Sequence, residues 1–491
     1  MNTRTLLRLS LVLACFLLAA CATDENAGTL EPTISLNDCR LDGGATAKCG
    51  TLTVLENRVI GSGRTIDLDI AVLPATGSSS ERQSDPLFLL AGGPGQAATE
   101  AYGGALYLFQ DANRLRDIVL IDQRGTGDSN GLACANLEDE ELPDDLPDEA
   151  VVDLLDDCRE ALADKADLSQ YTTALFIQDL DAVREALGYD RINLYGASYG
   201  TRAAQAYMRR YPERVRSAVL DAVVGPEQVL YLQMPRDAQR SLDSVFDRCE
   251  ADPACHQQFP AVRREYSELL DRLEQPVAIS VAHPLSNEPI DLTMDRERLG
   301  QFVFNILYSP DFQSLLPLLI HHAHETGDYT PLVIQGLAVA QSTGLYPGLL
   351  YAVICSEDAP LIDADTAAGY QAGTTFPLFA ERFTAICETW PRAAIDPGFR
   401  DPLQSDIPAL LLSGSADPIT PPIYAGSVAE GLSNSRQLIL PGYGHGVIGA
   451  GCMPKIVAEF FRTGDPAAPD TSCLEELQPP PFFTSFAGPE P

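Results

Sequence analysis

Residues 194–201 read Leu-Tyr-Gly-Ala-Ser-Tyr-Gly-Thr (LYGASYGT), an octapeptide whose surroundings indicate the fold of the chain. It places Ser198 between Gly196 and Gly200, in the pattern Gly-x-Ser-x-Gly. Because glycine and serine are common residues, this pattern can arise by chance in a chain of 491 residues. Its meaning depends on whether the rest of the chain supplies the strand, the helix and the partner residues that a nucleophilic serine needs.

The segments around the octapeptide alternate between buried strands and helices. Four short apolar runs predict strands, at residues 86–90, 118–121, 192–195 and 218–223. Helical patterns occupy residues 173–187 and 201–211, and a hairpin is expected over residues 51–55 and 66–73. Strands that are apolar on both faces and alternate with helices indicate a parallel sheet. We therefore expect an α/β fold with a mostly parallel central sheet flanked by helices.

The pattern changes after residue 225, where a mainly helical cap is expected. Amphipathic stretches predict helices over residues 237–250, 261–273, 296–307 and 375–388. Strand signals nearly vanish here apart from residues 277–281, and they return at 409–413 and 437–440, before a helix at 455–462. The expected division is a signal peptide (1–20), a leader (21–37), an α/β core (38–225), the helical cap (226–400), the rest of the core (401–475) and a tail (476–491).

Three strands end in loops that carry the residues needed for acyl transfer. A serine hydroxyl is a weak nucleophile unless a base accepts its proton, and Ser198 lies in a tight strand-to-helix turn. The strand at 409–413 leads to Asp417, and the strand at 437–440 leads to His445 in a glycine-rich loop. We predict that Ser198, Asp417 and His445 form a catalytic triad. Asp221 is the rival acid, and we expect it to be structural.

An oxyanion hole is expected beside this triad. Residues 91–95 read Ala-Gly-Gly-Pro-Gly and follow an apolar strand, so few side chains obstruct their N–H groups. The N–H of Gly92 or Gly93, together with that of Tyr199, would stabilise a tetrahedral intermediate. The alternative is that residues 91–95 form a plain turn.

The order Ser198, Asp417, His445 and the strands before them resemble the α/β-hydrolases. Residues 91–95 resemble the His-Gly-Gly-Pro-Gly element of proline iminopeptidases, with Ala91 in place of the histidine. Residues 122–129, Asp-Gln-Arg-Gly-Thr-Gly-Asp-Ser, match a second segment of that branch, and residues 38–475 are similar to its secreted tripeptidyl aminopeptidases. The resemblance implies release of single residues or tripeptides from peptide N-termini, without a cofactor. Asp122 and Arg124 are expected to brace the oxyanion loop.

An aminopeptidase must recognise a free α-amine, and a buried ammonium needs a paired charge. Residues 354–358, Ile-Cys-Ser-Glu-Asp, resemble a Cys-x-Asp or Cys-x-Glu segment of such enzymes. We therefore predict that Glu357 and Asp358 bind the substrate amine, held in place by a disulfide at Cys355. The alternative is that these residues form a solvated acidic loop.

The N-terminus has the features of a secretory signal peptide. Arg4 and Arg8 precede the apolar run 9–20, which is too short to span a bilayer comfortably. The run ends in Leu-Ala-Ala-Cys, which resembles the lipobox of bacterial lipoproteins and implies lipidation of Cys21. Ala22 after it favours the outer membrane, so we expect an exported protein in the periplasm or at the cell surface. The alternative is an ordinary cleaved signal peptide, with Cys21 incidental.

Cysteine usage agrees with export. Setting aside Cys15 and Cys21 leaves ten cysteines in five neighbouring pairs: Cys39 and Cys49, Cys134 and Cys158, Cys249 and Cys255, Cys355 and Cys387, Cys452 and Cys473. Sequence alone does not establish connectivity, but an oxidising compartment makes disulfides between neighbours the economical expectation. A metal site is not expected. The run His321-His322-x-His324 would point its side chains in different directions on a helix.

The chain carries a formal net charge of −36, which repels nucleic acid and anionic membrane surfaces. Membrane contact is expected only through a lipid anchor at Cys21. The expected partners are therefore peptide substrates, and the expected activity is that of a serine aminopeptidase. Two alternatives stay open: a carboxylesterase that acts on small esters, and a non-catalytic surface-binding protein that keeps the fold.

Overall fold

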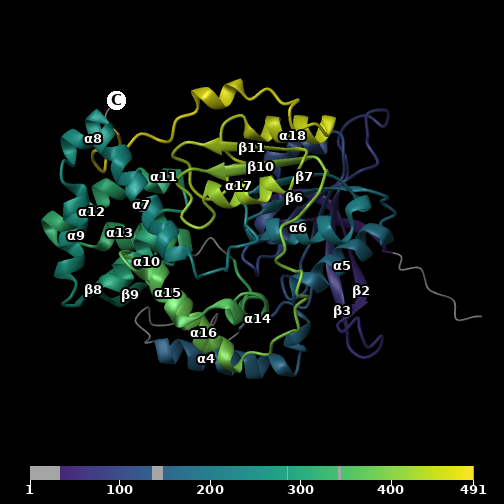
Figure 1. Cartoon of the computed structure of the whole chain (residues 1–491), viewed down its shortest axis with the longest axis horizontal. Coiled ribbons are helices and arrows are strands. Elements are labelled where there is room, and N and C mark those ends of the chain that lie inside the picture. The colour runs from purple at the N-terminus through teal and green to yellow at the C-terminus, as the bar shows by residue number, and fades with distance from the viewer. Residues whose placement is uncertain (1–33, 135–147, 285, 341–343, 378, 490–491) are drawn as a thin grey trace, which may run out of the picture. The chain divides into compact units, whose positions relative to one another are not determined.

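The computed structural model describes residues 34–489 except 135–147, 285, 341–343 and 378 (Figure 1). The predicted signal peptide, the lipidation site Cys21 and most of the leader lie outside the described residues. In the part of the chain that is described, none of the helices combines the length and the apolar character needed to cross a membrane.

The main sheet is mostly parallel, as expected. Among the described residues it contains nine strands: β1 (Asn37–Arg40), β2 (Thr46–Leu55), β3 (Thr65–Leu73), β4 (Leu87–Leu90), β5 (Ile118–Ile121), β6 (Ile192–Ala197), β7 (Val215–Asp221), β10 (Ala409–Gly414) and β11 (Ser435–Leu440). Their order is β1-β2-β3-β5-β4-β6-β7-β10-β11. The expected hairpin is the antiparallel pair β2–β3, and every neighbouring pair from β5 to β11 is parallel. The carboxyl ends of β6, β10 and β11 therefore lie along one edge of the sheet.

Helices cover both faces of this sheet. They are α1 (Ala98–Gly103), α2 (Gln110–Asn113), α5 (Thr173–Ala186), α6 (Tyr199–Arg210), α17 (Pro422–Glu430) and α18 (Met453–Thr463). Alternate side chains of β4 belong to different hydrophobic clusters: Phe88 packs with α5, α6 and α17, whereas Leu87 packs with α1 and α18. This alternation explains why the strand is apolar throughout.

The cap is built from helices and one small hairpin. The helices are α7 (Met234–Ala251), α8 (Pro253–Gln258), α9 (Val262–Arg272), α10 (Arg296–Ile306), α11 (Pro310–Gln313), α12 (Leu316–Thr326), α13 (Thr330–Ala340), α14 (Pro347–Glu357), α15 (Ala364–Gln371) and α16 (Phe379–Thr389). The predicted strand at 277–281 is β8 (Val277–Ala282), which pairs with β9 (Pro289–Met294). The expectation of a single strand signal here was wrong. The strand β9 was not predicted because it begins with a proline, although its Leu292 and Met294 are buried as in other strands.

Two further segments join the cap to the core. Helix α4 (Asp148–Ala163) packs with α14 and α16 in a hydrophobic cluster that also contains Tyr199 of α6. In the tail, Phe482 is buried in the hydrophobic cluster of the cap, and the N–H of Phe483 donates to the carbonyl of Ser314 at 3.1 Å. Short 3-10 turns complete the chain: η1 (Asp42–Gly44), η2 (Leu106–Phe109), η3 (Leu168–Gln170), η4 (Pro212–Arg214), η6 (Ala359–Leu361) and η7 (Ser472–Glu476).

All five predicted disulfides are present, each between neighbouring cysteines along the chain. They join Cys39 to Cys49, Cys134 to Cys158, Cys249 to Cys255, Cys355 to Cys387, and Cys452 to Cys473. The Cys355–Cys387 bond ties α14 to α16 within the cap. Such bonds persist in oxidising compartments, so they are a hint of export.

Candidate active site

Ser198 lies in the turn between β6 and α6. Its φ of 54° and ψ of −123° are unusual for a residue with a side chain, and such conformations cluster at functional sites. The flanking glycines make the turn possible: a Cβ at Gly196 would lie 2.5 Å from the carbonyl oxygen of Gly200, and a Cβ at Gly200 would collide with the carbonyl of Leu90. The Gly-x-Ser-x-Gly pattern therefore corresponds to a sharp strand-to-helix turn that presents Ser198.

Asp417 and His445 meet at the carboxyl ends of β10 and β11. The Nδ1 atom of His445 lies 2.9 Å from Oδ2 of Asp417. Oδ1 of Asp417 accepts hydrogen bonds from the main-chain N–H groups of Ile419 and Thr420, each at 2.8 Å, and Oδ2 accepts one from the Thr420 hydroxyl. The carboxylate is fully buried but well paired, so it is held toward the imidazole.

The electrostatics of this pair suit a general base. Burial opposes the charged imidazolium of His445, but the neighbouring Asp417 carboxylate outweighs burial and raises the pKa of His445 above its ordinary value of 6.5. Burial likewise opposes ionisation of Asp417, and attraction to His445 together with its hydrogen bonds lowers the pKa of that carboxyl below its ordinary value. Asp417 therefore stays ionised while His445 gains and loses a proton.

Ser198 and His445 line one cavity of about 440 Å³. Cap residues Tyr231, Met234 and Tyr308 form part of its wall, and most of the lining side chains are apolar. Among the described residues that line it, Asp221 is the only carboxylate. The cavity therefore accommodates an apolar ligand beside the Ser198 hydroxyl, under cover of the cap.

The candidate oxyanion donors differ in their availability. The N–H of Gly92 donates to Oε1 of Gln96 at 3.1 Å. The N–H groups of Gly93 and Tyr199 make no hydrogen bond with any described residue. Gly93 has a φ of 103°, which favours glycine, and Tyr199 is the first residue of α6, where N–H groups lack partners within the helix. Of the two glycines named from the sequence, Gly93 is thus the better placed.

Asp221 binds the main chain of the loop that carries His445 and makes no hydrogen bond to the His445 side chain among the described residues. Its carboxylate accepts hydrogen bonds from the Tyr195 hydroxyl at 2.9 Å and from the N–H groups of Val447 and Ile448. These two residues belong to the loop that carries His445. Asp221 has the structural position that we expected for it.

The cap holds the acid loop through contacts that the sequence did not reveal. Arg240 of α7 donates to the carbonyl oxygens of Ser415 and Asp417 at 2.8 and 2.6 Å. The carbonyl of Ala416 between them accepts from the Ser241 hydroxyl at 2.6 Å. Arg240 and Ser241 carry no motif, and their only sequence signal is their place on an amphipathic helix.

Asp122 and Arg124, which the sequence singled out in the segment 122–129, make different contacts. The Asp122 carboxylate accepts hydrogen bonds from the N–H and hydroxyl of Thr99, in the helix that follows the oxyanion loop. Burial raises the pKa of Asp122 to about 7. Arg124 instead forms a buried ion pair with Asp179 of α5, at 2.6 Å. The expectation that Arg124 braces the oxyanion loop was wrong.

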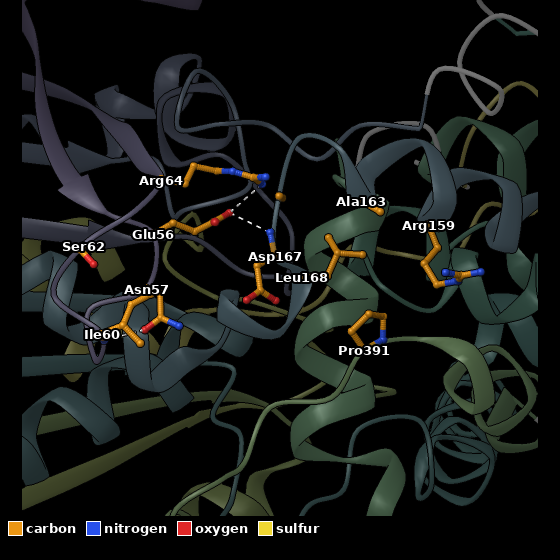
Figure 2. A pocket seen from close by; sticks show the side chains of 11 residues that line it. Glu56, Asn57, Ile60, Ser62, Arg64, Arg159, Ala163, Asp167, Leu168 and Pro391 are labelled. Atoms are coloured by element: carbon orange, nitrogen blue, oxygen red, sulfur yellow. Dashed lines mark hydrogen bonds and ion pairs between the residues drawn. The ribbon is translucent and has the colours of Figure 1, made fainter.

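A second cavity of about 460 Å³ lies beside the β2–β3 hairpin and α4 (Figure 2). Glu56 at its wall accepts a hydrogen bond from the N–H of Asp167 at 3.0 Å and lies 3.7 Å from Arg64. None of the residues predicted to act in catalysis lines this cavity. The candidate site is therefore the cavity that contains Ser198.

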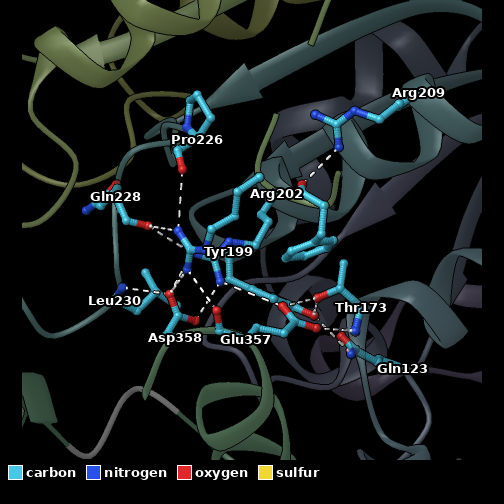
Figure 3. A network of polar contacts seen from close by, with 12 residues as sticks. Gln123, Thr173, Tyr199, Arg202, Arg209, Pro226, Gln228, Leu230, Glu357 and Asp358 are labelled. Carbon is cyan, nitrogen blue, oxygen red and sulfur yellow. Dashed lines mark hydrogen bonds and ion pairs between the residues drawn. The ribbon is translucent and has the colours of Figure 1, made fainter. Parts of the chain in front are cut away.

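Glu357 and Asp358 are buried and line neither cavity. Asp358 pairs with both Nη atoms of Arg202, at 2.7 and 3.1 Å, and with Arg400 (Figure 3). Glu357 accepts two hydrogen bonds from Thr173. The structure thus corrects the prediction that these carboxylates bind a substrate amine, and the alternative of a solvated loop: each already has partners inside the protein.

The histidines at 321, 322 and 324 pair separately with acids. His321 pairs with Glu265, His322 with Asp328, and His324 with both Glu268 and Glu325. Within the described ranges, no group of three or more histidine, cysteine or acidic side chains is arranged to hold a metal ion.

Comparisons with known proteins show what the chain as a whole is similar to. A family model described as "alpha/beta hydrolase fold" matches residues 85–287, and one described as "TAP-like protein" matches residues 377–473. The chain is 26% identical to the serine protease Hip1 of Mycobacterium tuberculosis over 470 residues, which cover 88% of each chain. The chain therefore has the α/β-hydrolase fold, as expected.

Two further relatives match shorter stretches. The tripeptidyl aminopeptidase of Streptomyces lividans is 29% identical over 212 residues, which cover 40% of this chain and 39% of that enzyme. The proline iminopeptidase of Neisseria gonorrhoeae is 27% identical over 199 residues, which cover 40% of this chain and 52% of that enzyme. The expected similarity to both kinds of enzyme is confirmed.

Proposed function

We propose that this chain is an exported serine aminopeptidase that hydrolyses peptide bonds near a free N-terminus, through Ser198, His445 and Asp417. The proposal rests on one observation: Ser198, in its strained turn, and the His445–Asp417 pair open on the same covered cavity. The names of the relatives support a peptidase, and the five disulfides support export.

We further propose that a lipid on Cys21 anchors the protein. Labelling with radioactive palmitate tests this, and it should disappear in Cys21→Ser.

In the proposed reaction, Oγ of Ser198 attacks the scissile carbonyl while His445 accepts its proton. His445 then donates that proton to the leaving amine, and Asp417 orients and stabilises the imidazolium. The N–H groups of Gly93 and Tyr199 stabilise the negative charge on the tetrahedral intermediate. Water, activated by His445, then hydrolyses the acyl-enzyme and regenerates Ser198.

A carboxylesterase acting on small esters is the second candidate. One observation favours it: the cavity is largely apolar, and its one described carboxylate, Asp221, already has hydrogen-bond donors. An ester needs no charged partner for an amine, whereas an aminopeptidase must distinguish a free N-terminus from a blocked one.

Hydrolysis of peptidyl p-nitroanilides separates the two candidates. The substrates are mono-, di- and tripeptidyl anilides of apolar residues, each with a free and an acetylated N-terminus, and Ser198→Ala is the control. An aminopeptidase should cleave the free peptides and lose nearly all turnover on acetylated ones. Equal turnover on both forms, or cleavage of p-nitrophenyl esters only, would favour the esterase.

A further inference from the structure

A buried chain of hydrogen bonds links the cap to the residue that follows Ser198 (Figure 3). Glu357, the last residue of α14, accepts from the N–H of Thr173 at 2.8 Å and from the Thr173 hydroxyl at 2.9 Å. The Thr173 hydroxyl also lies 2.6 Å from the hydroxyl of Tyr199. The same Tyr199 hydroxyl accepts from Nε2 of Gln123 at 3.2 Å. All four side chains are buried, so these hydrogen bonds replace the water that their polar groups would otherwise contact, and Glu357 also lies 3.7 Å from Arg202.

The ionised carboxylate of Glu357 sets the direction of these bonds. A carboxylate only accepts, so the single hydroxyl proton of Thr173 points to Glu357. The Thr173 oxygen then accepts the proton of the Tyr199 hydroxyl, and the Tyr199 oxygen accepts from Gln123. In this direction every donor has an acceptor, and the ring of Tyr199 is held at its hydroxyl end.

We propose that Glu357 is a positioning residue for the oxyanion hole: by accepting from Thr173 it holds the side chain of Tyr199, and with it the main-chain N–H that faces the reacting carbonyl. This inference rests on the proposed function, in which that N–H stabilises the tetrahedral intermediate. Tyr199 is both the first residue of α6 and the neighbour of Ser198. Its Cα carries both the anchored side chain and the N–H, so a shift of the side chain that displaces this Cα would move the donor relative to the nucleophile.

The neighbouring Asp358 has different hydrogen-bond partners, although Arg202 lies close to both carboxylates. It binds Arg202, one turn along α6, together with Arg400 and the N–H of Leu230. It has no hydrogen bond to Tyr199 or Thr173 among the interactions of the described residues. Asp358 thus clamps the helix, whereas Glu357 orients the one side chain at its start, and the two roles can be tested apart.

Protonation of Glu357 would reverse the direction of the hydrogen bonds that link it to Tyr199. The groups that face it are Thr173 from α5, Tyr199 and Arg202 from α6, Asp358, which directly follows α14, and Arg400, which donates to its main-chain carbonyl. Burial raises the pKa of Glu357 to about 7, although Arg202 and Thr173 oppose the rise. A protonated Glu357 donates to Thr173, which must then donate to Tyr199, and the proton of the Tyr199 hydroxyl loses its acceptor.

The test compares variants by hydrolysis of p-nitrophenyl butyrate, a small ester that makes little demand on peptide specificity. Glu357→Gln keeps the shape but places an amide donor toward the Thr173 hydroxyl, because its oxygen stays with the Thr173 N–H. Thr173→Val and Tyr199→Phe each remove a hydroxyl from this series of hydrogen bonds, whereas Thr173→Ser keeps the hydroxyl. Ser356→Ala is the matched control, since it removes a partly buried hydrogen bond from the N–H of Ala393 at the same helix end.

We expect Glu357→Gln, Thr173→Val and Tyr199→Phe each to lower kcat at least about 10-fold with little change in KM, below the roughly 10²–10³-fold loss when an oxyanion donor is removed. The double variant Glu357→Gln with Tyr199→Phe should be no slower than the worse single variant, because both substitutions break the same series of hydrogen bonds. Thr173→Ser and Ser356→Ala should keep the wild-type kcat. Protonation of His445 lowers activity in both proteins, so the wild-type pH profile should show an additional loss of activity near pH 7 that Glu357→Gln lacks.

Two outcomes are distinguishable. If the wild type shows no hydrolysis that Ser198→Ala abolishes, the proposed function fails. If that hydrolysis is present but folded Glu357→Gln and Tyr199→Phe match the wild type in kcat and in pH profile, the positioning role is overturned and the proposed function stands. Folding of each variant is checked by its denaturant midpoint, and Tyr199→Phe keeps the buried ring in case Glu357→Gln does not fold.

Discussion

The main-chain N–H of His445 donates a hydrogen bond to the carbonyl oxygen of Tyr308, 2.8 Å away. Tyr308 belongs to the cap and follows α10, so the cap holds the loop of the proposed base as well as covering the cavity. Gly444 permits this approach, because a Cβ there would collide with the same carbonyl. Together with Arg240 and Ser241, which bind the acid loop, this contact makes the cap part of the support of the triad.

Replacing Arg240 with alanine should weaken both stability and catalysis. The guanidinium donates to the carbonyls of Ser415 and Asp417, and hydrogen bonds from a charged group are worth about 1.5–3 kcal/mol. We expect a loss of that size in urea denaturation, with a lower kcat. Arg263→Ala, on the exposed face of α9, is the control and should change stability by under about 1 kcal/mol. Equal effects of the two variants would contradict the bracing role.

Replacing Asp417 with asparagine should reduce kcat by about 10⁴-fold and move the acid limb of the pH profile. His445 must be neutral to accept the serine proton, so activity falls as the pH drops through its pKa. In the wild type Asp417 raises that pKa above 6.5 against the effect of burial. Without the Asp417 carboxylate, burial still lowers the pKa of His445 and only the weaker attraction of Asp221 raises it, so the residual activity should fall at a lower pH. The measurement is kcat/KM against pH. An acid limb at the same pH in the wild type and in Asp417→Asn would argue against the pairing of Asp417 with His445.

Asp221→Ala should loosen the loop that carries His445. The N–H groups of Val447 and Ile448 lose their acceptor, and an unsatisfied buried donor costs about 1–3 kcal/mol. We expect lower thermal stability and a reduced kcat, with Asp221→Asn affected less because its amide oxygen still accepts. The measurement is calorimetry together with steady-state kinetics. A stable Asp221→Ala with full activity would show that the loop is held by other contacts.

The disulfides should differ in what they contribute. Cys355 and Cys387 are 32 residues apart, whereas Cys249 and Cys255 are 6 apart. Cross-linking a longer loop removes more entropy from the unfolded chain, by about 4 against about 2 kcal/mol in the chain-entropy model. Serine substitution of each pair, followed by guanidinium denaturation, should show the larger loss for Cys355 and Cys387. The reverse order would indicate that local strain or packing dominates.

Short-range patterns allowed correct predictions of much of the fold. The strand before Ser198 and the helix after it were readable because their residues are neighbours in sequence. The five disulfides followed from proximity along the chain. Likewise, Asp417 and His445 were named because each follows an apolar strand, and the parallel sheet brings those strand ends together.

Long-range packing accounts for what the sequence left open. The roles of Glu357 and Asp358 depend on Thr173 and Arg202, more than 150 residues away, and an acidic pair on a loop looks the same whether solvated or buried. The contacts of Arg240 with the acid loop and the burial of Phe482 in the cap also depend on tertiary packing alone. No local pattern distinguishes such residues from others on the same helix or tail.

The most direct test of the central claim is labelling with a biotinylated fluorophosphonate, followed by mass spectrometry of the tryptic peptides. The probe reacts with a serine only where a base has activated it. We expect one modified residue, Ser198, in the wild type, and no modification in Ser198→Ala or His445→Ala. Absence of labelling in the folded wild type, or labelling of a serine other than Ser198, would contradict the assignment of Ser198 as the nucleophile.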